Sequence, residues 1–165
     1  MDQVLFKFIN SLAGQSQVLD YLGVFFAEHL VWMMLALVLA LWLYKNLRTK
    51  VLLALGSALA GRVIVELLKR GIERARPFEV MDVNQLLIKD QGFSFPSGHA
   101  VILFAIALAF YRTRWFWPLI VLATIGSIAR VFVGVHYISD IIGSVVIAAL
   151  VVWGLKALFK KNFTV

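Results

Sequence analysis

Two histidines in this sequence have surroundings suited to nucleophilic and acid–base chemistry. His136 and Asp140 are four residues apart, so one helical turn can bring the carboxylate to the imidazole. A carboxylate on one ring nitrogen fixes the tautomer and leaves the other nitrogen as a nucleophile. His99 has no acid next to it in the sequence, which suits a general acid that protonates a leaving oxygen. The pattern predicts two histidines with separate roles.

Three cations could hold the anion on which these histidines act. Arg76 and Arg130 carry guanidinium forks that match pairs of phosphate oxygens, and Lys69 adds a point charge. The stretch 96–99 opens an apolar run, and the N–H groups at a helix start lie at the positive end of its dipole. Gly98 lets an anion approach that backbone closely. The predicted phosphate-binding residues are Lys69, Arg76, Ser97, Gly98 and Arg130.

The composition narrows the class of protein. Of the 165 residues, 62% are hydrophobic and none is cysteine, and the apolar residues form long runs typical of an integral membrane protein. Disulfides and thiolate metal sites are excluded. We expect no metal and no other cofactor, because the cations already neutralise phosphate and Asp140 is the one obvious carboxylate ligand nearby. The net charge of +7 is explained by cations that anchor loops to an anionic membrane surface, so we expect no nucleic-acid partner.

These residues must be positioned by helices that cross a membrane. The sequence predicts an all-α integral membrane protein, a single domain over 1–165, with membrane lipids as its surroundings and no obligate protein partner. A short segment over 3–13, with Lys7, Asn10 and Ser11 opposite an apolar face, is predicted to lie in the membrane interface. About five spans are expected, at 23–44, 51–68, 97–111, 115–133 and 138–158.

The charges in the loops predict the orientation. Two loops and the C-terminal tail carry eight cations and no acid, so these segments are expected on the cytoplasmic side. The cations are Lys45, Arg48, Lys50, Arg112, Arg114, Lys156, Lys160 and Lys161. The loop 69–95, with mixed charges, and the turn 130–137 then lie outside, together with the N-terminus. All the candidate site residues therefore share the outer membrane boundary.

The third span is short for a membrane crossing. From Gly98 to Tyr111 the helix would be about 21 Å long, against a hydrocarbon core of about 30 Å. If Arg112 marks the inner boundary, the helix begins below the outer surface. We therefore expect a site recessed to headgroup depth and open sideways to lipid.

The three polar clusters resemble the signature motifs of the type 2 phosphatidic acid phosphatase family, which are K-x6-RP, PSGH and SR-x5-H-x3-D. All three occur in order over a motif-bearing core of about 50–158. In this chain they are Lys69-x6-Arg76-Pro77, then Pro96-Ser97-Gly98-His99, then Arg130-x5-His136-x3-Asp140. One position departs, since Ala129 stands where the family has serine.

The resemblance implies metal-independent hydrolysis of a phosphate ester or anhydride through a phosphohistidine. It implies that His136 attacks phosphorus, that Asp140 orients His136 and that His99 protonates the leaving group. The short chain is similar to the small bacterial undecaprenyl-diphosphate phosphatases of the bacitracin-resistance type, which implies an inner-membrane enzyme with an extracytoplasmic site. Phosphatidylglycerophosphate or phosphatidate phosphatase is the alternative, because the motifs bind phosphate and not the lipid tail.

Two hypotheses of other classes remain at this point. A non-enzymatic lipid-phosphate carrier would use the same cations without needing a nucleophile. The soluble haloperoxidases share the motifs, but the apolar runs argue against them. Of the other charged residues, Arg62 and Glu66 are predicted to form a buried ion pair facing the bundle, and Arg70 and Arg74 are interpreted as interfacial anchors.

Overall fold

The computed structural model is helical and describes residues 1–88 and 92–159. No strand occurs within these two ranges, which confirms the all-α prediction. Lys160 and Lys161, which entered the charge pattern, lie outside the described residues, as do positions 89–91 of the loop 69–95. The helices are α1 (Asp2–Asn10), α2 (Gln17–Leu41), η1 (Lys45–Leu47), α3 (Arg48–Ile72), α4 (Pro77–Val80), α5 (Gly98–Ala109), α6 (Phe116–Phe132) and α7 (Ile138–Leu158).

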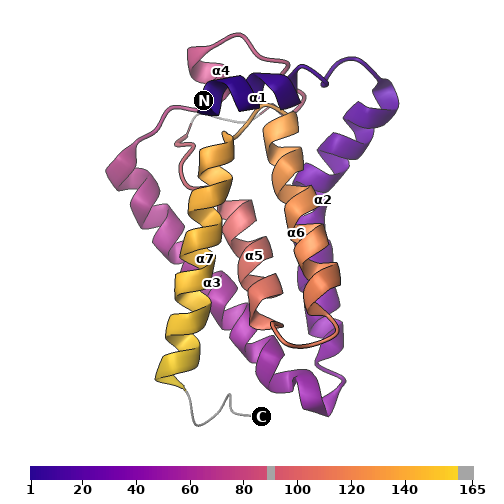
Figure 1. Ribbon diagram of the computed structural model, residues 1–165, viewed down its shortest axis with the longest axis vertical. Helices are drawn as coiled ribbons and strands as arrows, with labels where there is room; N and C mark the ends of the chain where they lie inside the picture. The colour runs from indigo at the N-terminus through magenta and orange to yellow at the C-terminus, as the bar shows by residue number, and fades with distance from the viewer. Residues whose placement is uncertain (89–91, 160–165) are drawn as a thin grey trace.

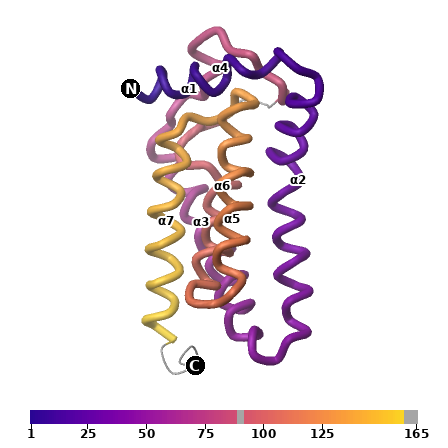
Figure 2. The backbone as a smooth tube through the Cα atoms, turned by 45° about the vertical axis from the view of Figure 1, so that its right-hand side comes forward, coloured from indigo at the N-terminus to yellow at the C-terminus, as the bar shows by residue number. Residues whose placement is uncertain are grey.

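Helix α5 forms the centre of the bundle, with α2, α3, α6 and α7 around it (Figure 1, Figure 2). Its sequence is apolar on every side, as expected of a helix buried all round. Small residues on its neighbours permit close approach. A Cβ built on Gly126 of α6 would lie 2.9 Å from both Leu103 of α5 and Leu30 of α2, so at this point the three helices pack directly against one another.

Within the described ranges 1–88 and 92–159, three helical segments are long and apolar enough to cross a membrane. They are Gln17–Leu41, Lys45–Val80 and Ile138–Leu158. Helices α5 and α6 are apolar but shorter, so the predicted shortness of the third span reappears in the 12-residue α5. Large apolar side chains such as Leu59 of α3 and Leu150 of α7 remain exposed on the outside of the bundle. An apolar exterior of this kind is what an integral membrane protein presents to lipid.

The motif-bearing segments meet at one end of the bundle. Figure 1 shows α1, α4 and the connection between α6 and α7 together at the top, whereas the α2–α3 and α5–α6 connections lie at the bottom. The bottom connections carry Lys45, Arg48, Arg112 and Arg114. The motif-bearing segments and the cationic connections therefore lie at opposite ends of the bundle, as the loop charges predicted.

Helix α1 lies across the top of α6 and α7 and is fastened to the bundle (Figure 2). Phe6 is fully buried and its ring centroid lies 5.5 Å from that of Tyr137. Asn10, predicted opposite the apolar face of this segment, is buried and donates to the carbonyl oxygens of Asn84 at 2.9 Å and Phe132 at 2.8 Å. The buried amide satisfies loop backbone groups, which no pattern within the helix reveals. Phe8 remains exposed, as an interfacial helix requires.

Candidate active site

A cavity of about 300 Å³ lies at the motif-bearing end of the bundle. It brings together residues from segments more than 100 positions apart. One side of its lining is apolar, from α2 and α5, and the other carries the cations and both motif histidines. The lining residues are Val31, Trp32, Leu35, Arg62, Lys69, Arg76, Gly98, His99, Ile102, Arg130 and His136.

His136 and Asp140 form the pair that their spacing predicted. His136 lies in the turn before α7, is 2% exposed, and its Nδ1 is 3.3 Å from Oδ2 of Asp140. Asp140 lies in the first turn of α7 and is fully buried. Its Oδ2 also accepts hydrogen bonds from the Tyr137 backbone N–H at 2.8 Å and from the Ser94 hydroxyl. A proton on Nδ1 donated to this carboxylate leaves the lone pair on Nε2 of His136.

The surroundings keep the imidazole of His136 neutral. Burial is the main cause that lowers its pKa to about 3; Asp140 acts in the opposite direction, and the charge of Arg130 adds to the lowering. A neutral imidazole retains a lone pair at physiological pH. The ring is therefore in the protonation state that a nucleophile needs.

Arg130 is almost completely buried, at 2% exposed, yet its hydrogen-bonding capacity is not filled. Its Nη1 donates to the carbonyl oxygen of Ala27 at 3.2 Å, while its buried Nε has no acceptor among the described residues. A buried donor without a partner costs free energy, roughly 1–3 kcal/mol. An anion in the cavity would supply the acceptor, since Arg130 lines it.

Arg76 and Lys69 bring two further charges to the cavity lining. The Arg76 guanidinium is anchored from behind, since Nε donates to the Gly92 carbonyl oxygen at 2.8 Å and Nη1 to that of Val135 at 3.4 Å. Lys69, in the last turn of α3, is half-buried. Both side chains line the cavity as predicted, so the motif cations share one space with His136.

The start of α5 provides the backbone part of the site. Gly98 and His99 are its first two helical residues, and both line the cavity. Ser97 is fully buried behind them and is not part of the lining. Its oxygen accepts the Ala100 N–H at 3.4 Å, and its own N–H donates to Ser144 at 2.9 Å. Ser97 thus caps the helix and holds its first N–H groups in place.

Arg62 is a cavity residue that sequence reasoning placed elsewhere. Its ion pair with Glu66 exists at 2.6 Å, but both side chains are 47% exposed and the pair is not buried in the bundle. The Arg62 guanidinium lies beside the first residue of α5, since a Cβ built on Gly98 would be 3.5 Å from it. Arg62 precedes Lys69 by seven residues, which puts both on one face of a helix. This spacing could have indicated from the sequence that Arg62 lies on the same side as the site lysine.

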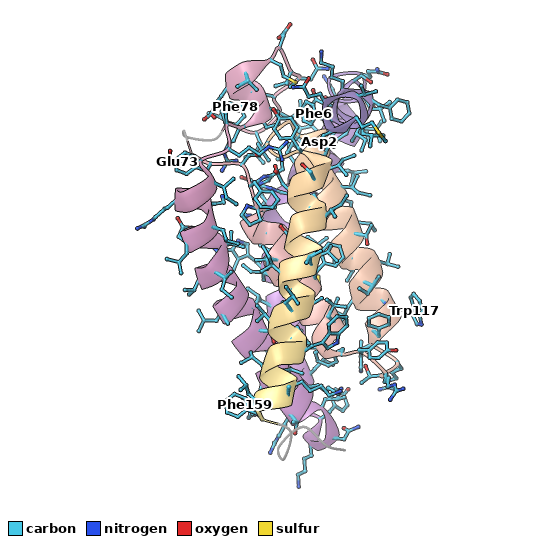
Figure 3. The ribbon with its side chains drawn as sticks, turned by 60° about the vertical axis from the view of Figure 1, so that its left-hand side comes forward. Asp2, Phe6, Glu73, Phe78, Trp117 and Phe159 are labelled. Atoms are coloured by element: carbon cyan, nitrogen blue, oxygen red, sulfur yellow. The ribbon has the colours of Figure 1, made fainter. Side chains whose placement is uncertain are left out.

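Arg74 is the second residue that the sequence misassigned. Interpreted as an interfacial anchor, it instead donates from Nη1 to Oδ1 of Asp140 at 2.7 Å and to the Ser139 hydroxyl at 2.6 Å. Its Nη2 donates to Oδ2 of Asp2 at 2.6 Å. Figure 3 shows Asp2 at the end of α1, over the start of α7. No spacing rule could reveal these contacts, because they join three separate parts of the chain.

Two further points concern position 129 and groups of side chains that could hold a metal. Ala129 is buried in an apolar cluster with Ala27 and Val133, so no hydroxyl is presented at this position. Within residues 1–88 and 92–159, no three His, Asp or Glu side chains gather as a metal site would require. The cavity instead carries its positive charge on arginine and lysine.

Comparisons with known proteins match this chain to a known family and to solved structures of the same fold. A family model described as the PAP2 superfamily matches residues 29–164. Undecaprenyl-diphosphatase BcrC of Bacillus subtilis (strain 168) is 32% identical over 155 residues, which cover 92% of this chain and 80% of that protein. Among solved structures, Aquifex aeolicus LpxE is similar with a TM-score of 0.76 and 25% identity, covering 92% of both chains. A PAP2-type phosphatidylglycerolphosphate phosphatase from Bacillus subtilis shares the fold, with a TM-score of 0.69 and 22% identity, over 98% of this chain and 87% of that one.

Proposed function

Since this chain belongs to the PAP2 superfamily, we propose that it removes the terminal phosphate from undecaprenyl diphosphate through a phosphohistidine intermediate. The family match confirms the resemblance seen in the three motifs, and with phosphatases among its relatives the chain is a lipid phosphatase. The observation that carries the mechanism is the buried His136–Asp140 pair, whose imidazole lines a cavity together with the motif cations.

The proposed reaction has two steps. Nε2 of His136 attacks the terminal phosphorus, the bond from phosphorus to the bridging oxygen breaks, and His99 donates a proton to that oxygen. Lipid monophosphate leaves. Water then attacks the phosphohistidine and gives a proton to His99, the bond from Nε2 to phosphorus breaks, and inorganic phosphate is released with both histidines restored. Asp140 fixes the tautomer of His136 and stabilises its positive charge as the ring becomes phosphorylated.

The phosphate-binding residues have distinct tasks in this proposal. Arg76 and Arg130 bind phosphoryl oxygens through their forks, and Lys69 contributes charge. The N–H groups of Gly98 and His99 bind a further oxygen at the positive end of the α5 dipole. Ser97 acts through the cap that holds these groups. With this charge supplied by side chains, the reaction requires no metal and no other cofactor.

Two features of the cavity favour a lipid diphosphate. Arg62 adds a cation beyond the motif set, placed to bind the phosphate that stays with the lipid. Trp32, Leu35 and Ile102 provide an apolar side against which a polyprenyl tail can lie. The name of the Bacillus subtilis relative, undecaprenyl-diphosphatase, points to the same substrate. Phosphatidylglycerophosphate and phosphatidate are the alternatives, and one protein of the same fold is named for the former.

We place the enzyme in a bacterial inner membrane as one domain, residues 1–165. All of α2, α3, α5, α6 and α7 cross the membrane in this proposal, and α1 lies in the outer interface. The cationic connections at the bottom of Figure 1 support a cytoplasmic position for that end. The cavity then opens at the extracytoplasmic leaflet, at the depth where the short α5 begins.

His136→Ala tests the proposed function. In detergent-solubilised protein we expect phosphate release from undecaprenyl diphosphate to be abolished while binding of the lipid persists. His29→Ala is the matched control, because His29 is exposed on α2 and does not line the cavity. Substantial turnover by His136→Ala would reject the mechanism, and lipid binding without turnover by the unmodified chain would favour a carrier. Parallel rates with phosphatidylglycerophosphate and phosphatidate identify the preferred lipid.

A further inference from the structure

The carboxylate of Asp140 is held on both of its oxygens, and the two sets of donors come from different places. Oδ2 accepts hydrogen bonds from the Tyr137 N–H and the Ser94 hydroxyl and faces Nδ1 of His136. Oδ1 receives one guanidinium N–H of Arg74, at 2.7 Å. A carboxylate fixed on one oxygen alone could rotate about its side-chain bonds. Arg74 therefore sets the direction in which Oδ2 faces the imidazole.

Arg74 is in turn held by the N-terminal helix. Its second terminal nitrogen donates to Oδ2 of Asp2 at 2.6 Å, and its Cζ lies 4.1 Å from the centre of the Tyr137 ring. Asp2 also accepts from Ser139, from the N–H at 3.1 Å and from the hydroxyl at 2.5 Å. The side chains of Arg74 and Asp2 are 30% and 29% exposed, so their ion pair is partly shielded from solvent.

We propose that Arg74 and Asp2 are positioning residues for phosphoryl transfer, which act on His136 through Asp140. This rests on the proposed function, in which His136 is the nucleophile. The chain of contacts runs from Asp2 to Arg74, then to Asp140 and finally to the imidazole. It makes α1, at the very start of the chain, a part of the catalytic apparatus.

Charge explains why both residues are present. Arg74 alone, 2.7 Å from Asp140, would draw electron density from the carboxylate that must stabilise the imidazolium. Asp2 shares the positive charge of Arg74 and so preserves the basicity of Asp140 toward His136. Arginine also suits this place better than lysine, because its planar fork reaches two carboxylates at once. The cost of a misplaced nucleophile is large, since a shift of about 1 Å can lower a rate by roughly 100-fold.

The test measures kcat and KM on undecaprenyl diphosphate for a set of variants. We expect Arg74→Met to lower kcat roughly 10- to 100-fold with KM changed less than about twofold, since Arg74 does not line the cavity. Arg74→Lys should restore part of kcat. Asp2→Ala should lower kcat by a smaller factor, and Asp2→Asn, which keeps an acceptor, should recover part of it. In the Arg74→Met background Asp2→Ala should have little further effect, because it acts through Arg74.

Matched controls separate positioning from general loosening of the fold. Arg70→Met and Asp82→Asn remove comparable charges from exposed positions at the same end, and both should retain wild-type kcat.

Two outcomes would contradict different claims. If His136→Ala is inactive while Arg74→Met, Arg74→Lys and Asp2→Ala keep kcat within twofold, the positioning role is wrong and the proposed function stands. Turnover by His136→Ala would reject the proposed function itself. Should Arg74→Met fail to fold, the lysine and Asp2 variants still decide between these outcomes.

Discussion

Arg130 is nearly inaccessible to solvent, and one of its donors has no acceptor in the described part of the chain. A fold would not retain such an arginine for stability, because apolar side chains of similar volume fill space at lower cost. The energetic cost is explained if the guanidinium binds an anion during each turnover. The sequence predicted an anionic ligand from three cations and a helix start, and the burial and the unfilled donor of Arg130 come from the structure.

Arg62 leads to a prediction about selectivity. If it binds the phosphate that stays with the lipid, Arg62→Met should lower kcat/KM for a lipid diphosphate roughly tenfold more than for a monophosphate with the same tail. Arg62→Lys should recover part of the difference. Phosphate release from farnesyl diphosphate and farnesyl phosphate in detergent measures this ratio. Arg70→Met is the control, since Arg70 is exposed and away from the cavity lining; equal losses on both substrates would reject the assignment.

The buried imidazole of His136 predicts how stability depends on pH. Its pKa is lowered from 6.5 to about 3 in the folded chain, so between these values only the unfolded chain binds the proton. Stability from this residue is therefore complete above pH 6.5 and falls on acidification by up to ~1.4 kcal/mol per pH unit. The thermal midpoint in detergent should drop between pH 7 and pH 5, and the drop should be smaller in His136→Asn. The same drop in both proteins would contradict the burial argument.

At the scale of elements, α5 determines whether the site can form. It carries Gly98 and His99 at one end, and its depth in the bundle sets the level of the cavity. Close packing around it depends on small residues such as Gly61, where a Cβ would approach Val101 to 3.0 Å. In lipid, helices associate through such van der Waals packing and not through a hydrophobic driving force. Local packing on α5 is therefore coupled to the geometry of the site.

Gly126→Val tests this packing. The new side chain would collide with Leu103 and Leu30, each 2.9 Å from the Cβ position. We expect overpacking of about 1–3 kcal/mol and a thermal midpoint lowered by roughly 3–10 °C. Gly154→Val on α7 is the control, because nothing lies within 4 Å of that position and the change in helix propensity is the same. Equal midpoints for the two variants would show that the contact is not tight.

At the scale of the whole molecule, one end holds the cavity and the other holds the cationic connections. Figure 3 shows Asp2 and Phe6 near one end and Trp117 and Phe159 near the other. The first end holds the cavity with His136, and the second carries cationic connections. An orientation across the membrane follows from this difference if the positive-inside rule holds for this chain.

Because the chain has no cysteine, single cysteines can report the orientation. Ile88→Cys, at a position 94% exposed in the connection between α4 and α5, should react with a membrane-impermeant maleimide in intact cells. Asn46→Cys, exposed in the α2–α3 connection, should react only after the membrane is permeabilised. The reverse pattern would place the cavity on the cytoplasmic side.

By itself, the sequence determined the helical class, the three motifs and the residues expected at one membrane boundary. These follow from local information, since apolar runs of span length and fixed spacings of charged residues do not depend on the rest of the fold. The His136–Asp140 contact was predictable for the same reason, as one helical turn joins the two residues.

Only the tertiary structure decided which side chains complete the site. Arg62 faces the cavity and not the bundle interior, Arg74 binds Asp140, and Asn10 binds the loop at Asn84. Each outcome depends on the rotation of a helix about its axis or on the path of a loop. Packing between distant segments determines both, and no pattern within a single segment contains that information.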